Sequence, residues 1–187
     1  MPLSQPTERE HIHNRTVECN GYRRADGLWD IEGQLVDVKT YTFQNNERGD
    51  VPPGEPVHEM WVRLTVNDDL KIHAVEVVTD YSPFAVCKQV APNFERLVGT
   101  SIGPGWRKRV RDRVGGVEGC THIVELLGPV ATTAFQTIYP LKNRENPEGT
   151  TRSSRPPRLL NTCHAFRSDG LKVKEIWPDH YDGPESN

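Results

Sequence analysis

The 187-residue sequence has no long hydrophobic run and only a small excess of negative charge. No stretch approaches the ~18 consecutive apolar residues that a membrane-spanning helix needs, and residues 1–6 lack the basic-then-apolar order of a secretion signal. The net charge of −3 argues against nucleic acid as the main partner, because nucleic-acid-binding domains carry an excess of Lys and Arg. We therefore expect a cytoplasmic protein that binds neither membranes nor nucleic acid.

Cysteine is also scarce, and its spacing excludes a disulfide scaffold. The four cysteines form no CxxC pair and are widely separated along the chain: Cys19, Cys87, Cys120 and Cys163. The sequence also contains no phosphate-binding glycine loop, dinucleotide fingerprint, HExxH or GxSxG motif. Any catalytic or binding site must therefore be sought in less regular patterns, in a chain whose thiols we expect to be reduced.

The fifteen prolines and fifteen glycines indicate a polar, turn-rich chain, and its length fits one domain. We predict a flexible N-terminus over residues 1–15 and a single α+β domain over residues 16–141. Residues 142–158 have the Pro, Arg and Ser content of a linker. Residues 159–187 are predicted to pack on the domain, with a turn at Ser168-Asp169-Gly170 that favours a hairpin.

Apolar and polar residues alternate in three segments, as is typical of half-buried strands. They are residues 28–43, 57–66 and 71–79, and the short connections favour an antiparallel meander. In the first segment we place Asp37 among the polar residues of the strand. The alternation there is interrupted at Gly33, which predicts a β-bulge at that position.

Helical spacing follows in residues 83–98, 106–114 and 123–139. The first has apolar residues three or four apart: Val86, Val90, Phe94 and Leu97. The last has a broad apolar face: Ile123, Leu126, Leu127, Val130, Ala131, Ala134 and Ile138. Pro129 inside it predicts a kink or a restart. The fold class is thus α+β, an antiparallel sheet of about three or more strands with helices on one face.

His58 is the leading candidate for proton transfer. On a strand it shares the apolar face with Met60 and Val62. We expect desolvation there to place the pKa of His58 near the working pH, where a base is most effective. A hydrogen-bonded core histidine would explain the same pattern.

A second cluster opens the last helix. Cys120, His122 and Glu125 fall within six residues, and a helix N-terminus lowers the pKa of a thiol placed there. These side chains could bind a metal, or they could serve as nucleophile, base and orienting group. The alternative is that Thr121 caps the helix and Cys120 behaves as a small apolar residue.

Three further sets are candidates for substrate binding. Arg23 or Arg24 could anchor an anion or phenolate, and Trp29 or Trp61 could stack an aromatic ring. Solvated charges on an edge strand would explain the arginines equally well. Gln136 belongs to a polar stripe on the last helix, which fits either helix packing or a lined cavity. The basic segment 107–113 is either a solvated helix face or a contact for a partner.

Several of these motifs, with Asn14-Arg15-Thr16, residues 54–60 and Ala131–Thr137, resemble a bacterial family catalogued as domain of unknown function 2889 (DUF2889). This resemblance implies a place in bacterial catabolism of aromatic compounds, including lyase steps on lignin-derived dimers. The order of strands, Cys87 and the Cys120–His122 segment is also similar to iron–sulfur scaffold proteins of the NifU/IscU type. The third cysteine ligand of those proteins is absent here, which argues against cluster assembly.

We therefore expect a cofactor-independent acid–base lyase that acts on a small aromatic substrate. Its cleft would lie between the strand of His58 and the helix that opens at Cys120, with both imidazoles facing a hollow walled by indole rings. His58 would act with His122 and Glu125 as catalytic residues. The alternative is a zinc- or iron-binding or carrier module that uses Cys87, Cys120 and His122. A non-catalytic partner subunit is a second alternative, and self-association into a homo-oligomer is left open.

Overall fold

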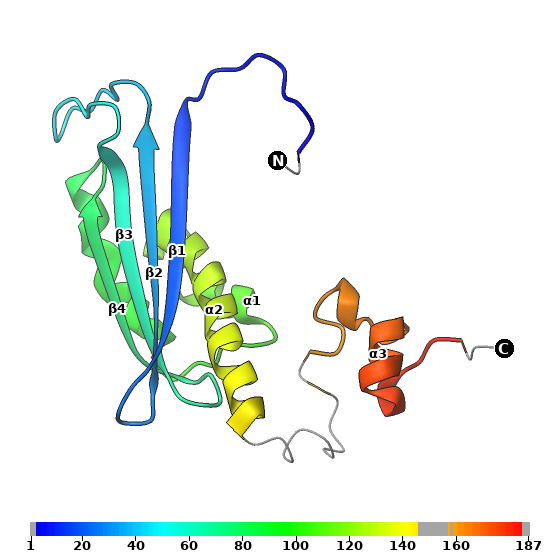
Figure 1. Cartoon of the computed structure of the whole chain (residues 1–187). Helices are drawn as coiled ribbons and strands as arrows, with labels where there is room; N and C mark the ends of the chain where they lie inside the picture. Colours follow the sequence, from blue (N-terminus) through cyan, green and yellow to red (C-terminus); the bar gives the residue numbers. More distant parts are fainter. Residues whose placement is uncertain (1–2, 146–156, 158, 185–187) are drawn as a thin grey trace. The chain divides into compact units, whose positions relative to one another are not determined.

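The computed structural model describes residues 3–145, 157 and 159–184 (Figure 1). The chain divides into two compact units, residues 1–140 and 141–187, and each is considered by itself. The first unit contains a four-stranded sheet and the helices that cover it, so the predicted α+β class is confirmed.

The sheet is an antiparallel meander with the strand order β1-β2-β3-β4. Its strands are β1 (His13–Arg23), β2 (Trp29–Lys39), β3 (Pro56–Val66) and β4 (Ile72–Tyr81). The three predicted strands are confirmed, but the sequence prediction missed β1 and placed its first residues in a flexible terminus. β1 lies at the edge of the sheet and is exposed along almost its whole length, so its residues carry no alternating pattern that could reveal a strand.

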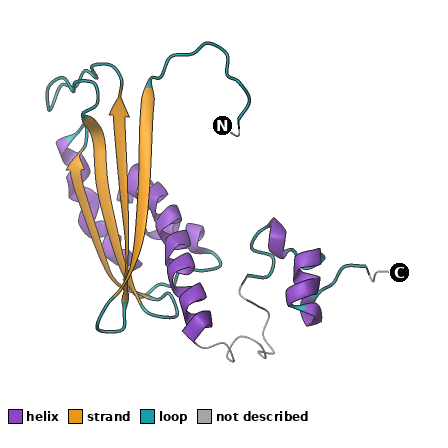
Figure 2. Ribbon diagram, in the orientation of Figure 1, coloured by secondary structure: helices purple, strands orange, loops and turns teal. Residues whose placement is uncertain are grey.

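Four helical segments follow the sheet in the first unit. They are the 3-10 helix η1 (Ala85–Leu97), α1 (Trp106–Val114), the short η2 (Gly116–Glu118) and α2 (Thr121–Glu145). Figure 2 shows the helices gathered on one face of the strands, as predicted. The bounds of α1 match the prediction.

Two helix predictions need correction. η1 is a 3-10 helix, in which only Phe94 and Leu97 of the four predicted apolar positions are buried, because three residues per turn do not keep an α-helical stripe on one side. The linker predicted from residue 142 begins inside α2, and residues 146–156 and 158 lie outside the described residues.

The second unit contains short helices and no hairpin in its described residues. They are η4 (His164–Phe166), α3 (Leu171–Ile176) and η5 (Pro178–His180). The predicted turn at 168–170 ends at Gly170, which is the residue before α3, so the chain after it coils instead of returning as a strand. Whether this segment packs on the domain stays a prediction.

β2 shows unbroken alternation between buried and partly exposed residues. The bulge predicted at Gly33 is wrong: Gly33 pairs in register with both neighbouring strands, and the irregularity between β2 and β3 lies at Asp37/Val38. A Cβ at Gly33 would come within 2.5 Å of the side chain of Val130 on α2. The glycine is therefore a packing residue that lets the helix approach the sheet, and Asp37, four residues on, falls on the same core-facing side.

α2 supplies the largest apolar contribution to the core. All seven residues predicted for its apolar face are the ones that are buried. The helix continues through Pro129, so the predicted restart there is not observed. Its first hydrogen bond runs from the N–H of Val124 to the carbonyl of Cys120 at 2.9 Å. This start places His122 in the first turn of the helix.

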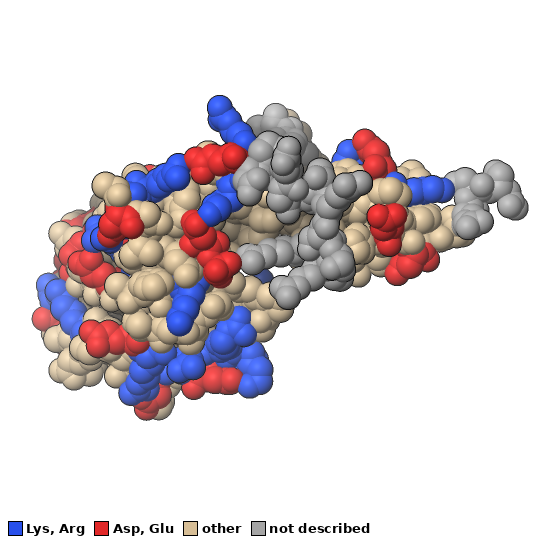
Figure 3. All heavy atoms as spheres, turned by 90° about the horizontal axis from the view of Figure 1, so that it is seen from below, with Lys and Arg blue, Asp and Glu red and all other residues tan. Residues whose placement is uncertain are grey.

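The opposite face of the sheet carries charged side chains in pairs. Arg63 donates to Glu32 and to Glu76 at 2.7 Å in each case, and the indole N–H of Trp61 donates to Asp80 at 3.0 Å. The view in Figure 3 shows basic and acidic side chains intermixed on the face that it draws. Among the helices of the described ranges, none has the combination of length and apolar character that a membrane crossing requires.

Candidate functional site

A buried carboxylate, Asp37, lies near the end of β2. It is 2% exposed, and a charged group at such a position needs partners that replace water. Arg15 on β1 provides a two-pronged contact, with its Nε 2.7 Å from Oδ1 and its Nη2 2.8 Å from Oδ2. His13 Nε2 lies 3.2 Å from Oδ1. Asp37 is therefore the centre of a polar cluster inside an otherwise apolar layer.

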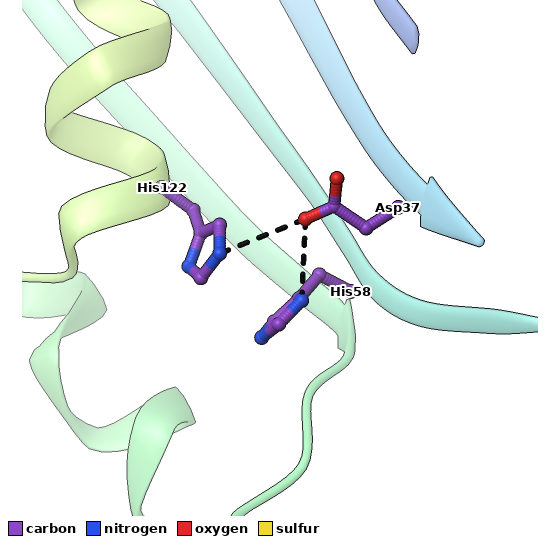
Figure 4. A group of neighbouring side chains, drawn as sticks. All are labelled: Asp37, His58 and His122. Atoms are coloured by element: carbon purple, nitrogen blue, oxygen red, sulfur yellow. Dashed lines mark ion pairs between the residues drawn. The ribbon is translucent and has the colours of Figure 1, made fainter. Parts of the chain in front are cut away.

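Two imidazoles from distant parts of the chain meet at the other side of this carboxylate. His58 comes from β3 and His122 from the first turn of α2, and both point toward Asp37 (Figure 4). His58 Nδ1 lies 3.3 Å and His122 Nε2 lies 3.6 Å from Asp37 Oδ2. The ring centroids are 3.9 Å apart, with an angle of 31° between the planes. The predicted meeting of His58 and His122 is thus observed.

The surroundings shift the protonation of both kinds of group. Burial, followed by the neighbouring His122, lowers the pKa of His58 to about 4, against the attraction of Asp37. Burial by itself raises the pKa of Asp37, but the hydrogen bonds and charge of Arg15 outweigh it, and the pKa lies below its ordinary value. At neutral pH the site therefore contains an ionised carboxylate next to a neutral His58.

Cys120 extends the cluster on the far side of His122. Its sulfur lies 3.8 Å from His122 Nδ1. Burial raises the pKa of the thiol, but hydrogen bonds with His122 and with backbone N–H groups at the start of α2 outweigh that effect and lower it. Cys120, His122 and Asp37 thus form a continuous row, as in sites where a base lies between a nucleophile and an orienting carboxylate.

Glu125, predicted as a catalytic residue, is paired with Arg15 and with neither imidazole among the hydrogen bonds and ion pairs of the described residues. Its Oε2 accepts a hydrogen bond from Arg15 Nη1 at 2.9 Å, and its side chain is 57% exposed. Glu125 therefore acts on the site through Arg15, whose guanidinium it shares with Asp37.

The predicted arginines and tryptophan around the turn between β1 and β2 lie far from this cluster. Trp29 is eight residues from Asp37 on the same strand, which is about 26 Å at the rise of a strand. Its ring is buried, and its indole N–H donates to Asp68 at 3.0 Å. Arg23 lies over this ring, with 5.4 Å from its guanidinium carbon to the ring centroid. Arg24 pairs with Asp26 in its own turn and with Asp30 on β2.

The other two predicted binding residues are also remote from the imidazoles. Trp61 lies on β3 with its side chain on the opposite face of the sheet, where it lines a shallow hollow of about 290 Å³ with Arg63 and Val78. Gln136 is exposed on α2, fourteen residues beyond His122, which is about 21 Å along a helix. The hollow walled by indole rings is therefore not observed around the two histidines.

The alternative metal-ligand set is only partly brought together. Cys120 and His122 are neighbours, but Cys87 on η1 is not part of any group of potential ligands found among the described residues. The group found there has Asp37, His58 and His122, whose ligand atoms all lie within 4.8 Å of one another.

Sequence reasoning missed Asp37, Arg15 and His13 as site residues. The signal for Asp37 was a charged residue at a core-facing position of β2. The bulge predicted at Gly33 shifted the expected alternation, so Asp37 was counted among the polar residues of the strand. Arg15 and His13 lie in the first three residues of β1, which were assigned to the flexible N-terminus. Without that strand, nothing in the sequence joins Arg15 to Asp37.

Comparison with known proteins adds a family. A model described as "Protein of unknown function (DUF2889)" matches residues 13–136. The chain belongs to this family. The match starts at the first residue of β1 and contains every residue described here around Asp37. No curated protein and no solved structure matches the chain, so the NifU/IscU likeness stays a prediction.

Proposed function

We propose that this DUF2889 protein is a small-molecule enzyme that transfers protons at the His58–His122 pair. The observation that carries the proposal is the stacking of two imidazoles, 3.9 Å apart, on one buried carboxylate. Such a pair costs desolvation and charge repulsion, and arrangements that shift pKa values in this way concentrate at catalytic sites.

His58 is the proposed base. Its Nδ1 faces the carboxylate, so the neutral ring donates its N–H to Asp37 and keeps the lone pair on Nε2. Arg15 fixes Asp37 with two parallel hydrogen bonds, and Asp37 in turn fixes the tautomer and the direction of the ring. Asp37 and Arg15 are positioning residues in this scheme.

The reaction class that fits one exchangeable proton is an elimination, as expected of a lyase. His58 Nε2 accepts a proton from the substrate, the released electron pair forms a double bond, and the bond to the leaving group breaks. The protonated pair then returns the proton to the leaving group, so that protons balance over the cycle. His122 at 3.9 Å disfavours a second charge and makes the protonated His58 a stronger acid.

The substrate class proposed is a small aromatic compound of the lignin-derived type. This part rests on the resemblance described above and has no contact assigned to it. The remote positions of Trp29, Trp61, Arg23, Arg24 and Gln136 remove them as partners of His58, and the ring-binding surface is left unassigned.

The test is product formation by the full chain on a panel of phenolic dimers, followed by mass spectrometry. His58→Asn keeps an N–H donor toward Asp37 but has no base, and we expect a loss of at least 100-fold, the lower range for general-base catalysis. His73→Asn, at an exposed histidine of β4, is the matched control. Equal turnover by the wild type and His58→Asn would refute the proposal.

A further inference from the structure

The distances from Asp37 Oδ2 to His58 and His122 fit the ligand shell of a metal ion better than they fit hydrogen bonds. An N–H···O bond has a usual length of about 2.9–3.0 Å, whereas Asp37 Oδ2 lies 3.3 Å from His58 Nδ1 and 3.6 Å from His122 Nε2. A tetrahedral ion held at about 2.0–2.1 Å by nitrogen and oxygen ligands separates them by about 3.3 Å. The two measured separations lie at or a little above that value.

We propose that Asp37, His58 and His122 form a binding site for a divalent transition-metal ion such as Zn²⁺. Each residue presents one ligand atom, and all three atoms lie within 4.8 Å of one another. Imidazole nitrogens are borderline ligands, and two of them beside one carboxylate oxygen suit Zn²⁺, Fe²⁺ or Co²⁺ better than Mg²⁺ or Ca²⁺, which prefer all-oxygen sites. Three protein ligands leave a fourth position for water, as in catalytic rather than structural sites.

The groups behind the ligands are those that metal sites use to orient them. Arg15 holds Asp37 by both oxygens, and the sulfur of Cys120 faces the other ring nitrogen of His122. Glu125 accepts from the same Arg15. Two carboxylates and one guanidinium give the pocket one net negative charge before a metal enters, which favours a cation.

This site is the one used in the proposed function, and occupancy has a definite consequence there. A neutral imidazole that coordinates through Nδ1 carries its proton on Nε2. His58 therefore cannot accept a substrate proton while the metal is bound, and a water at the open metal position would supply a base in its place. Metal binding and proton uptake by His58 exclude one another.

The binding experiment needs no substrate. Zn²⁺ is titrated calorimetrically into the full chain, with any tag removed and after treatment with a chelator. We expect one ion per chain, with a Kd of roughly 10 μM or tighter. His58→Ala and His122→Ala should each weaken binding at least tenfold, as should Asp37→Asn, while His73→Ala and Cys87→Ser should leave it unchanged. Circular dichroism of each variant establishes that it is folded.

A measurement on the wild type keeps the test independent of variant folding. On addition of Zn²⁺, the ring ¹⁵N resonances of His58 and His122 should shift, and that of His73 should not. Absence of wild-type binding, or unshifted His58 and His122 resonances, would overturn the site. A tenfold loss in Cys87→Ser would overturn it too, because it would assign a thiolate ligand set. Binding without turnover refutes the enzyme proposal alone, and turnover without binding refutes the metal site alone.

Discussion

The partial burial of His58 predicts how much the free energy of unfolding changes with pH. The folded chain lowers the pKa of His58 from 6.5 to about 4, so between these values the unfolded chain binds a proton that the folded chain does not. The contribution of His58 to the free energy of unfolding is therefore fully present above about pH 6.5, and it is lost as the pH falls toward 4. The full shift corresponds to about 3 kcal/mol, of which about 2 kcal/mol is lost between pH 7 and pH 5. The conversion is justified because the side chain is only 19% exposed.

His58→Asn isolates this contribution, because asparagine keeps the donor to Asp37 and does not titrate. The assay is urea denaturation of both proteins at pH 7, 6 and 5 in the presence of a chelator. Titrating groups that do not contact His58 are common to the two proteins and cancel in the difference. We expect the wild type to lose about 2 kcal/mol more than the variant over this range. Parallel pH curves would show that His58 is protonated as easily in the folded chain as in the unfolded one, and the reasoning would fail.

Three other substitutions or probes test the site and its scaffold. Arg15→Lys should lower the free energy of unfolding by about 1 kcal/mol in urea, because lysine cannot donate two parallel N–H groups to a carboxylate. Gly33→Ala should cost about 1–3 kcal/mol through overpacking against α2, whereas Gly128→Ala, where a Cβ meets nothing within 4 Å, should raise the melting temperature slightly. Iodoacetamide should alkylate Cys120 at pH 7 severalfold more slowly in His122→Gln than in the wild type, since the histidine lowers the thiol pKa; equal rates by mass spectrometry would contradict the pairing.

The parts of the fold that could be predicted are those in which one face is buried over a long segment. α2 was predicted with its complete buried face, because seven apolar positions repeat at helical spacing over sixteen residues. β1 has one neighbour and two exposed faces, so burial imposes no pattern on it. A composition rich in polar residues then indicates a loop, although backbone pairing with β2 makes it a strand.

The candidate site was half predictable for a related reason. His58 was selected because it shares the apolar face of its strand, and His122 because it belongs to a cluster of reactive residues at the start of a helix. Their meeting on Asp37 depends on the register of β2 with β3 and on where α2 crosses the sheet, neither of which is encoded in local spacing. Trp29 and Trp61 were assigned to the site by chemical type alone. Trp29 lies at the far end of β2 and Trp61 on the opposite face of the sheet, so neither contacts the two histidines.

Two residues that contact Asp37 lie on β1, which is an edge strand and is exposed along almost its whole length. Arg15 and His13, which contact Asp37, lie on a strand that is hydrogen-bonded to a single neighbour. When such a border strand detaches, which requires less than global unfolding, the carboxylate loses both partners at once and faces the two imidazoles alone. A peptide or another molecule that binds β1 or displaces it therefore changes the electrostatic environment of His58 and His122.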